Sequence, residues 1–219
     1  MSVKVLVIKL RMSLAYLVAG DDGLVLVDAG LRSEEGKILR SIHDSGAGKL
    51  NLIYITHAHL DHYGSAAALK RATGAPIAIH QQDEEIMSRG ETPIWEAAGF
   101  GKVMAFFLPA AYPFLRPEPA KADIILNDGD NLTEFGIRGR VLHTPGHTLG
   151  SSSLVLDDQI AFVGDLVTNK GRPRLQRYFA QNWSQLPESL RRIQALKLAQ
   201  IYPGHGAAPF SAKLLDDLI

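Results

Sequence analysis

The chain has 219 residues, 46% of them hydrophobic and 21% charged, which is the composition of an ordinary folded protein. Its 23 basic and 23 acidic residues cancel, so no net charge favours nucleic acid or an anionic membrane as a partner. The absence of cysteine excludes disulfides, iron–sulfur clusters, thiolate zinc sites and a cysteine nucleophile. Any metal site must therefore be built from histidine and carboxylate side chains.

The first third of the chain alternates strands with helices. The stretch "VKVLVIKL", residues 13–18 and residues 24–28 indicate strands, and "DDG" between the last two is a hairpin signal. An amphipathic helix starts at Ser33 and ends at the glycines of "SGAGK", and "LNLIYIT" is a continuous apolar strand. A helix over Ser65–Thr73 and the strand "PIAIH" continue this α/β pattern.

Residues 83–120 depart from this pattern. They start as a polar helix, "DEEIMSR", and then become apolar, with four prolines between Pro109 and Pro119 and no clean periodicity. We expect one metal-binding domain over residues 1–219, with an insertion or cap at about residues 83–120. Its aromatic part, residues 95–115, could form one wall of an apolar pocket for a small-molecule substrate, or the contact of a homodimer.

The second half returns to strands and ends in helices. The stretches "DIIL", "IRGRVLHT", "SSSLVLD" and "QIAFVGD" predict strands, followed by a helix over residues 187–198, the strand "IYPGHG" and a final helix over residues 211–219. The N-terminus lacks the features of a secretory signal, and no apolar run approaches the roughly 20 residues of a membrane span. We therefore expect an α/β protein of the cytoplasm.

The stretch "THAHLDH" places three of the chain's 8 histidines and an aspartate directly after an apolar strand. Three further polar side chains, His147, Asp165 and His205, each end an apolar strand beside a glycine turn. In an α/β fold the carboxyl ends of neighbouring strands converge on one rim, where ligands bind. We expect the whole set to meet there, and it comprises His57, His59, Asp61, His62, His147, Asp165 and His205.

Seven donors are too many for one zinc ion, which takes about four ligands, and are enough for two cations. We expect His57, His59 and His147 to bind the first ion. We expect Asp61, His62 and His205 to bind the second, with Asp165 as the bridge. The expected cofactor is two divalent metal ions, with zinc as the first choice and iron or manganese as the alternatives.

Such a pair of cations has a direct chemical use. It would lower the pKa of a shared water toward about 7, so that hydroxide forms at neutral pH and attacks a carbonyl or phosphoryl group. Asp61 could orient that hydroxide or accept its proton. The pattern therefore predicts metal-dependent hydrolysis.

The ordered motifs "VLVDAG", "THAHLDH", "TPGHT", "GD" and "PGHG" resemble those of the metallo-β-lactamase-fold hydrolase superfamily, over about residues 14–206. The resemblance implies a four-layer αββα sandwich with a dinuclear metal site at one edge. The matching residues of that superfamily are the ligands assigned above. Asp28 of "VLVDAG" matches a residue that orients the ligand loop, a role that metal sites generally need.

Within that superfamily the chain is similar to the small glyoxalase II-like and lactonase-like members. His59 stands where redox-active di-iron relatives usually carry glutamate, which favours hydrolysis. Only fourteen residues follow His205, so we expect no glutathione-binding appendage of the glyoxalase II kind. The resemblance implies a small ester, lactone or thioester as substrate. The alternatives are a di-iron redox enzyme, a phosphoesterase or β-lactamase-type hydrolase, and a binding protein without catalysis.

The residues after Asp165, "LVTNKGRPRLQRYFAQNW", lie where related hydrolases often place groups that bind substrate. Tyr178 could donate a hydrogen bond to a developing oxyanion, and Arg172 or Arg174 could bind an anionic group. The remaining histidines are predicted to have no catalytic role, and they are His43, His80 and His143.

Overall fold

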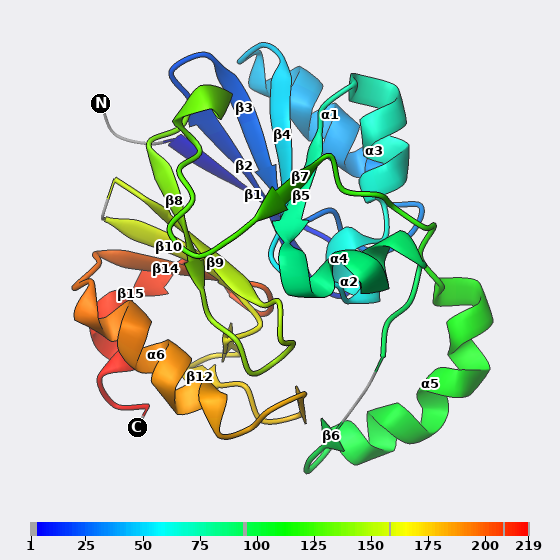
Figure 1. The fold of residues 1–219 in the computed structure, drawn as a ribbon, viewed down its shortest axis with the longest axis vertical. Coiled ribbons are helices and arrows are strands. Elements are labelled where there is room, and N and C mark those ends of the chain that lie inside the picture. The colour runs from blue at the N-terminus through cyan, green and yellow to red at the C-terminus, as the bar shows by residue number, and fades with distance from the viewer. Residues whose placement is uncertain (1–3, 94–95, 158, 208, 219) are drawn as a thin grey trace.

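Figure 1 shows the computed structural model, which describes residues 4–93, 96–157, 159–207 and 209–218. Two sheets lie at its centre. The six-stranded sheet has, in order, β1 (Lys4–Lys9), β2 (Leu14–Gly20), β3 (Gly23–Val27), β4 (Leu50–Ile55), β5 (Ile77–His80) and β7 (Ile124–Leu126). The five-stranded sheet has β15 (Phe210–Ser211), β14 (Gln200–Pro203), β10 (Ile160–Gly164), β9 (Ser152–Leu156) and β8 (Gly139–His143).

The strand directions explain where polar residues gather. Strands β1, β2 and β3 are antiparallel, and the predicted hairpin joins the last two. Strands β3, β4, β5 and β7 run parallel, so the carboxyl ends of β3 and β4 lie at the same edge of the sheet. Asp28 follows β3 and Thr56 follows β4, and the two residues meet at that edge.

Three apolar layers hold the fold together. The side chains of β4 alternate, so that Leu52 and Tyr54 face the second sheet while Ile53 and Ile55 face the helices. Helices α1 (Glu35–Ser45) and α3 (Ala66–Thr73) cover the first sheet, and α6 (Gln185–Ala195) covers the second. The order helix, sheet, sheet, helix confirms the predicted four-layer αββα sandwich.

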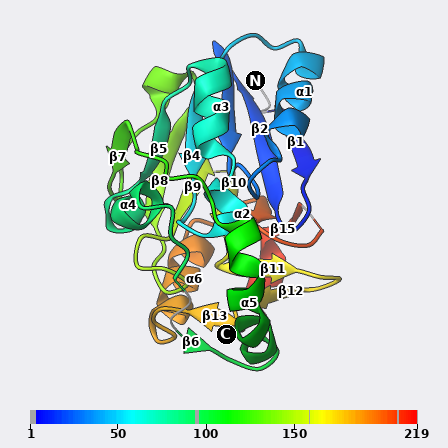
Figure 2. The same ribbon diagram turned by 90° about the vertical axis from the view of Figure 1, so that its right-hand side faces the viewer.

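The predicted insertion at residues 83–120 contains two helices with different surroundings. Helix α4 (Gln81–Ser88) buries Asp83 and Met87, so it belongs to the body of the fold. Helix α5 (Gly101–Leu115) lies along one side of the molecule and curves (Figure 1, Figure 2), as expected from Pro109 and Pro113 in its interior. The sequence of this stretch has no clean periodicity, yet residues 101–115 form the helix α5. The first residue of the predicted pocket wall, Trp95, lies outside the described residues.

One further prediction needs correction. The final helix predicted over residues 211–219 is only the 3-10 turn Ala212–Leu215, which follows the short strand β15. The segment after Asp165 contains short strands that were not predicted, because β11 (Val167–Asn169) and β12 (Pro173–Leu175) pair as a hairpin, and β13 (Phe179–Ala180) pairs with β6 (Glu96–Ala97). The short helices α2 (Leu60–Tyr63) and Thr133–Phe135 complete the structure. No helix in the described ranges is both long and apolar enough to cross a bilayer.

Candidate metal centre

The loop after β4 and the short helix α2 together carry four of the predicted ligands, with His57 and His59 on the loop and Asp61 and His62 on the helix. These side chains are almost fully buried, since the exposed fractions are 1% for His57, 8% for His59, 8% for Asp61 and 0% for His62. The imidazole and carboxylate groups lie inside the fold because β4 ends at the edge of the sheet, at Ile55, and α2 begins soon after it, at Leu60. Imidazole and carboxylate groups are buried in this way when they are paired or bind metal.

The first predicted group comes together as expected. The ligand atoms of His57, His59 and His147 all lie within 4.8 Å of one another. His59 Nδ1 is 2.8 Å from His147 Nε2. His147 follows β8 on the second sheet, so this group joins the two sheets at one edge.

The second predicted group lies beside it. His205 Nε2 is 3.3 Å from Asp61 Oδ2 and 3.4 Å from His62 Nε2. Two nitrogens bound to one tetrahedral zinc at about 2.0–2.1 Å would lie about 3.3–3.4 Å apart. The spacing between His62 and His205 is therefore that of two ligands of a single ion.

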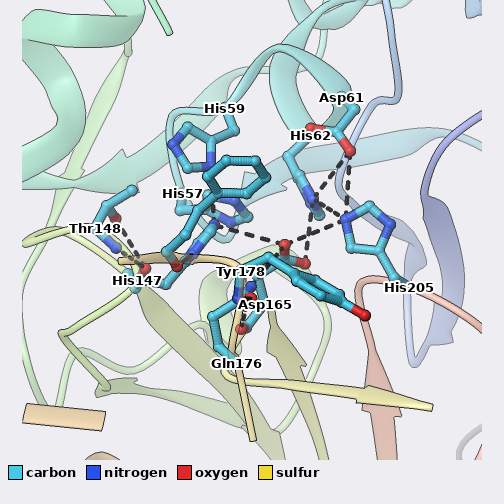
Figure 3. A network of polar contacts seen from close by, with 12 residues as sticks. His57, His59, Asp61, His62, His147, Thr148, Asp165, Gln176, Tyr178 and His205 are labelled. Carbon is cyan, nitrogen blue, oxygen red and sulfur yellow. Dashed lines mark hydrogen bonds and ion pairs between the residues drawn. The ribbon is translucent and has the colours of Figure 1, made fainter. Parts of the chain in front are cut away.

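Asp165 lies between the two groups, as the bridging role requires (Figure 3). Its Oδ2 is 3.5 Å from His147 Nε2 and 3.2 Å from His205 Nε2, and its Oδ1 is 3.4 Å from His62 Nε2. The close approach requires glycine at position 204, because a Cβ there would lie 2.5 Å from Asp165 Oδ1. All seven predicted side chains thus converge.

Asp28 orients the ligand loop in the way that the resemblance implies. The Nδ1–H of His62 donates to Asp28 Oδ2 (2.8 Å), and the backbone N–H of Thr56 donates to Asp28 Oδ1 (2.9 Å). Asp28 adopts φ +62°, which turns its carboxylate back toward the loop. The bond to Nδ1 leaves His62 Nε2 directed at Asp165.

Two other imidazoles are oriented in the same manner. The Nδ1–H of His147 donates to the carbonyl of Phe179 (2.8 Å), and the Nδ1–H of His205 donates to the carbonyl of Met12 (2.7 Å). Each bond fixes the ring and leaves Nε2 facing the site. Metal-binding histidines usually donate their second ring N–H to a carbonyl or carboxylate.

The protonation of the two groups differs. Burial, together with the neighbouring imidazoles, holds the pKa of His57 and His59 well below the usual value, so both are neutral ligands at pH 7. Burial also lowers the pKa of His62, but Asp28, Asp61 and Asp165 outweigh it and raise the pKa to about 10. Metal entering the second group must therefore displace protons.

The residues fit a pair of metal ions. In the part of the chain that the structure describes, His57 Nε2 is buried and makes no hydrogen bond. A buried ring nitrogen without a partner is costly, and a cation among three imidazoles would satisfy it. The mixed histidine and carboxylate set suits zinc, iron or manganese.

The comparisons with known proteins agree with this geometry. Residues 8–205 match the family described as the metallo-beta-lactamase superfamily. The chain belongs to the metallo-β-lactamase superfamily. The members of that superfamily are generally metal-dependent hydrolases, so the predicted family and enzyme class are both confirmed.

Several relatives of this superfamily resemble the chain. An uncharacterized protein of Mycobacterium leprae is 29% identical over 191 residues, covering 86% of this chain and 82% of that protein. A beta-lactamase hydrolase-like protein of Xylella fastidiosa is 34% identical over 112 residues, but these are 51% of this chain and only 22% of that protein. The di-iron-bound crystal structure of TTHA1623 has 27% identity and a TM-score of 0.73, covering 98% of this chain and 97% of that one. The BLEG-1 B3 metallo-beta-lactamase has a TM-score of 0.78 and covers the same shares at 21% identity, which shows the fold alone.

One polar residue that supports the metallo-β-lactamase centre was missed by sequence reasoning. Asp83 on α4 is fully buried and accepts hydrogen bonds from the backbone N–H of Ala58 (2.8 Å), the hydroxyl of Thr148 (2.7 Å) and the backbone N–H of Gly150 (2.8 Å). It therefore ties the loop of His57 and His59 to the loop of His147. The only indication in the sequence was that Asp83 follows the predicted strand "PIAIH" within a few residues.

A cavity of about 370 Å³ opens onto the metal centre of this superfamily member. Its polar end includes His59, Asp61, His147, Asp165 and His205. Its apolar wall includes Met104, Leu108 and Leu115 of α5 and Phe100, which directly precedes that helix. The helix thus lines the cavity, as predicted for residues 95–115. Most of its aromatic side chains remain exposed, with 78% for Phe106 and 84% for Phe114, and dimer formation through them stays a prediction.

The residues after Asp165 are only partly placed as expected. Tyr178 lines the cavity, and its hydroxyl accepts a hydrogen bond from Arg177 Nη2 (2.8 Å), so its own O–H remains able to donate. Lys170 lines the cavity, whereas Arg172 and Arg174 do not. The predicted anion-binding role of these two arginines therefore has no support at the cavity.

The other histidines lie outside the metal groups. His80 is buried at the end of β5, directly before α4, and its ring stacks on that of His143 with 4.1 Å between centroids. Burial, and then the neighbouring His143, lower the pKa of His80 to about 4, so it is neutral at pH 7. The side chain of His43 is 90% exposed.

Proposed function

We propose that the protein is a dinuclear metal-dependent hydrolase of a small ester, lactone or thioester, with zinc as its metal. The observation that carries this proposal is the position of Asp165 between two histidine groups at the polar end of an apolar cavity. Pockets of a few hundred Å³ with few polar groups are typical of small-molecule sites. A cytoplasmic location and the lack of nucleic-acid or membrane partners remain predictions from composition.

The proposed reaction assigns the metal ligands to two groups of side chains. The proposed ligands hold the metals as two groups, the first of His57, His59 and His147 and the second of Asp61, His62 and His205, with Asp165 shared. Two bound cations lower the pKa of water and polarise a carbonyl oxygen.

The chain's own side chains then handle protons and charge. The carboxylate of Asp61 lines the cavity and can accept the proton that an attacking water loses. The free O–H of Tyr178 can donate to the oxyanion that develops on the carbonyl. The α5 wall would exclude water from the non-reacting part of the substrate.

A second candidate function is a di-iron redox activity. It is favoured by one observation, the di-iron-bound form of TTHA1623, which is 27% identical to this chain. The histidine at position 59 argues against it, because redox-active relatives usually carry glutamate there.

A substrate screen tests the proposal. Protein reconstituted with zinc, iron or manganese is incubated with panels of esters, lactones, thioesters, β-lactams and phosphodiesters. We expect hydrolysis of at least one acyl class with kcat/KM of about 10⁴ M⁻¹s⁻¹ or more. Fully metal-loaded protein that hydrolyses none of them would overturn the proposal. Bound iron with oxygen consumption and no hydrolysis would favour the redox alternative.

A further inference from the structure

Gln176 lies directly beside the proposed bridging residue (Figure 3). It is only 6% exposed, and its Nε2 is 3.2 Å from the backbone carbonyl oxygen of Asp165 and 3.4 Å from Asp165 Oδ2. An amide nitrogen carries two hydrogens, so this one group can donate both to the backbone and to the carboxylate of the same residue. Gln176 therefore restrains the main chain and the side chain of Asp165 together.

The other end of the amide determines which atom faces Asp165. Oε1 of Gln176 accepts hydrogen bonds from the backbone N–H groups of Arg177 (2.9 Å) and Tyr178 (3.0 Å). Backbone N–H groups can only donate, so the amide oxygen must lie on their side and the nitrogen on the side of Asp165. Both hydrogens and both lone pairs of the amide are then used, and the side chain is held in one orientation.

The same amide holds the backbone of Tyr178, the proposed donor to the oxyanion. On the other side of that residue, the carbonyl of Tyr178 accepts a hydrogen bond from the N–H of Ala98 (2.9 Å). A Cβ at Gly101, the first residue of α5, would lie 2.3 Å from that carbonyl oxygen, so the helix starts in close contact with it. Gln176, Asp165 and Tyr178 all line the cavity. Gln176 thus connects the proposed metal bridge to the wall of the cavity.

A neutral side chain suits this place beside the bridge. Asp165 Oδ2 faces His147 and His205, while Oδ1 is buried and makes no hydrogen bond to the described residues. A lysine or arginine in place of Gln176 would compete with the cations for the carboxylate of Asp165, and an acidic residue would repel it. An amide donates a hydrogen bond to the carboxylate and leaves its negative charge to the cations.

We propose that Gln176 is a positioning residue, which holds the carboxylate of Asp165 between the two metal groups and the backbone of Tyr178 beside it. This inference rests on the proposed dinuclear hydrolase, but its first test needs metal binding alone. The second metal group should depend on Gln176 more than the first, because Asp165 approaches two histidines of the second group and one of the first.

Metal titration measures that difference. Gln176→Met keeps the length of the side chain and removes both ends of the amide. Titration of the metal-free protein with cobalt(II), in competition with a chromophoric chelator, gives one dissociation constant for each ion. The variant should bind the second ion about 10–100-fold more weakly, while the constant of the first ion changes less than about threefold. Equal weakening of both ions would contradict a role through Asp165 and indicate general damage to the fold.

A second variant removes only the donor. Gln176→Glu keeps an oxygen that accepts from the N–H groups of Arg177 and Tyr178, so this turn retains its hydrogen bonds. The visible absorption spectrum of the cobalt-loaded protein reports the geometry around the ions, and it should differ from that of the wild type. A spectrum identical to that of the wild type would overturn the proposed contact.

The matched control is a glutamine that makes a comparable hydrogen bond elsewhere. Gln194 on α6 donates from its Nε2 to the carbonyl of Leu215 (2.8 Å), and neither residue lines the cavity. Gln194→Met should therefore leave both metal constants and the cobalt spectrum unchanged. Weakening of the second ion in this variant as well would contradict a specific role for Gln176.

Kinetics with the best substrate of the screen connect Gln176 to the reaction. In Gln176→Glu, kcat should fall about tenfold or more while KM changes less than about threefold, because the lost interaction is made to the reacting end of the site. Selective loss of the second ion in a protein that hydrolyses no ester would overturn the hydrolase proposal and leave the role of Gln176 standing. Wild-type metal constants and spectra in the variants of an active hydrolase would overturn the role of Gln176 alone.

Discussion

Replacing Asp165 with asparagine should lower kcat/KM for any hydrolysed substrate by at least about 100-fold and reduce the metal content below two ions per chain. Even partners that only orient metal ligands contribute about 10–100-fold, and Asp165 contacts both proposed groups directly. Asparagine keeps the size of the side chain but removes the negative charge that faces His62, His147 and His205. Steady-state kinetics and elemental analysis of the dialysed protein measure the two effects.

The control for this variant is the same chemical change at an exposed site. Asp44 lies on α1 with 77% of its side chain exposed, so Asp44→Asn should leave metal content and activity unchanged. An Asp165→Asn protein with two metals and with activity within threefold of wild type would show that Asp165 is not the bridge.

Replacing Asp83 with alanine should lower the free energy of unfolding by about 2–4 kcal/mol, because three buried donors lose their acceptor. Metal affinity should fall about 10–100-fold as well, since the loops of His57 and His147 are no longer tied together. Part of the cost is offset, because burial raises the pKa of Asp83 and the variant no longer buries a charge. Denaturant unfolding and competition with a chelator separate the two effects.

Asparagine at the same position gives an intermediate case. Its one carbonyl oxygen can still accept from Ala58 and Thr148, but its amide would face the N–H of Gly150, so Asp83→Asn should lose less affinity than Asp83→Ala. Glu85 on the same helix is 71% exposed and serves as the control, because its pair with Arg89 contributes only about 0.3–0.5 kcal/mol. If Asp83→Ala binds metal as tightly as Glu85→Ala, Asp83 does not position the ligand loops.

The metal centre could be predicted from the sequence because each proposed ligand follows an apolar strand. Strand ends are recognisable locally, and parallel strands bring their ends to one edge whatever lies between them. This is why His147, Asp165 and His205 could be joined to the "THAHLDH" loop without coordinates. The four-layer arrangement followed from the same ordered motifs.

Asp83 could not be found in this way because its importance lies in distant backbone donors. Its partners are 25 to 67 residues away in the chain, and two of its three hydrogen bonds come from backbone N–H groups. A backbone donor leaves no trace in residue identity. The sequence places Asp83 in a polar helix and carries no sign that this face is buried.

Helix α5 and the β11–β12 hairpin were not predicted from the sequence, for a different reason. Most side chains of α5 stay exposed, so the apolar residues show no periodic face, and two prolines interrupt the pattern. Successive residues of a strand face opposite sides of the sheet. Because the β11–β12 hairpin was not predicted, the residues of this segment that face the cavity could not be distinguished from those that face solvent. The choice of Arg172 or Arg174, neither of which lines the cavity, follows from that gap.

The central claim is that one set of loops holds two metal ions. Anomalous diffraction from crystals of the metal-reconstituted protein measures this most directly. It should give two peaks about 3.5–4 Å apart, one among His57, His59 and His147 and one among Asp61, His62 and His205, with Asp165 touching both. A single peak, or none among these side chains at saturating metal, would contradict it.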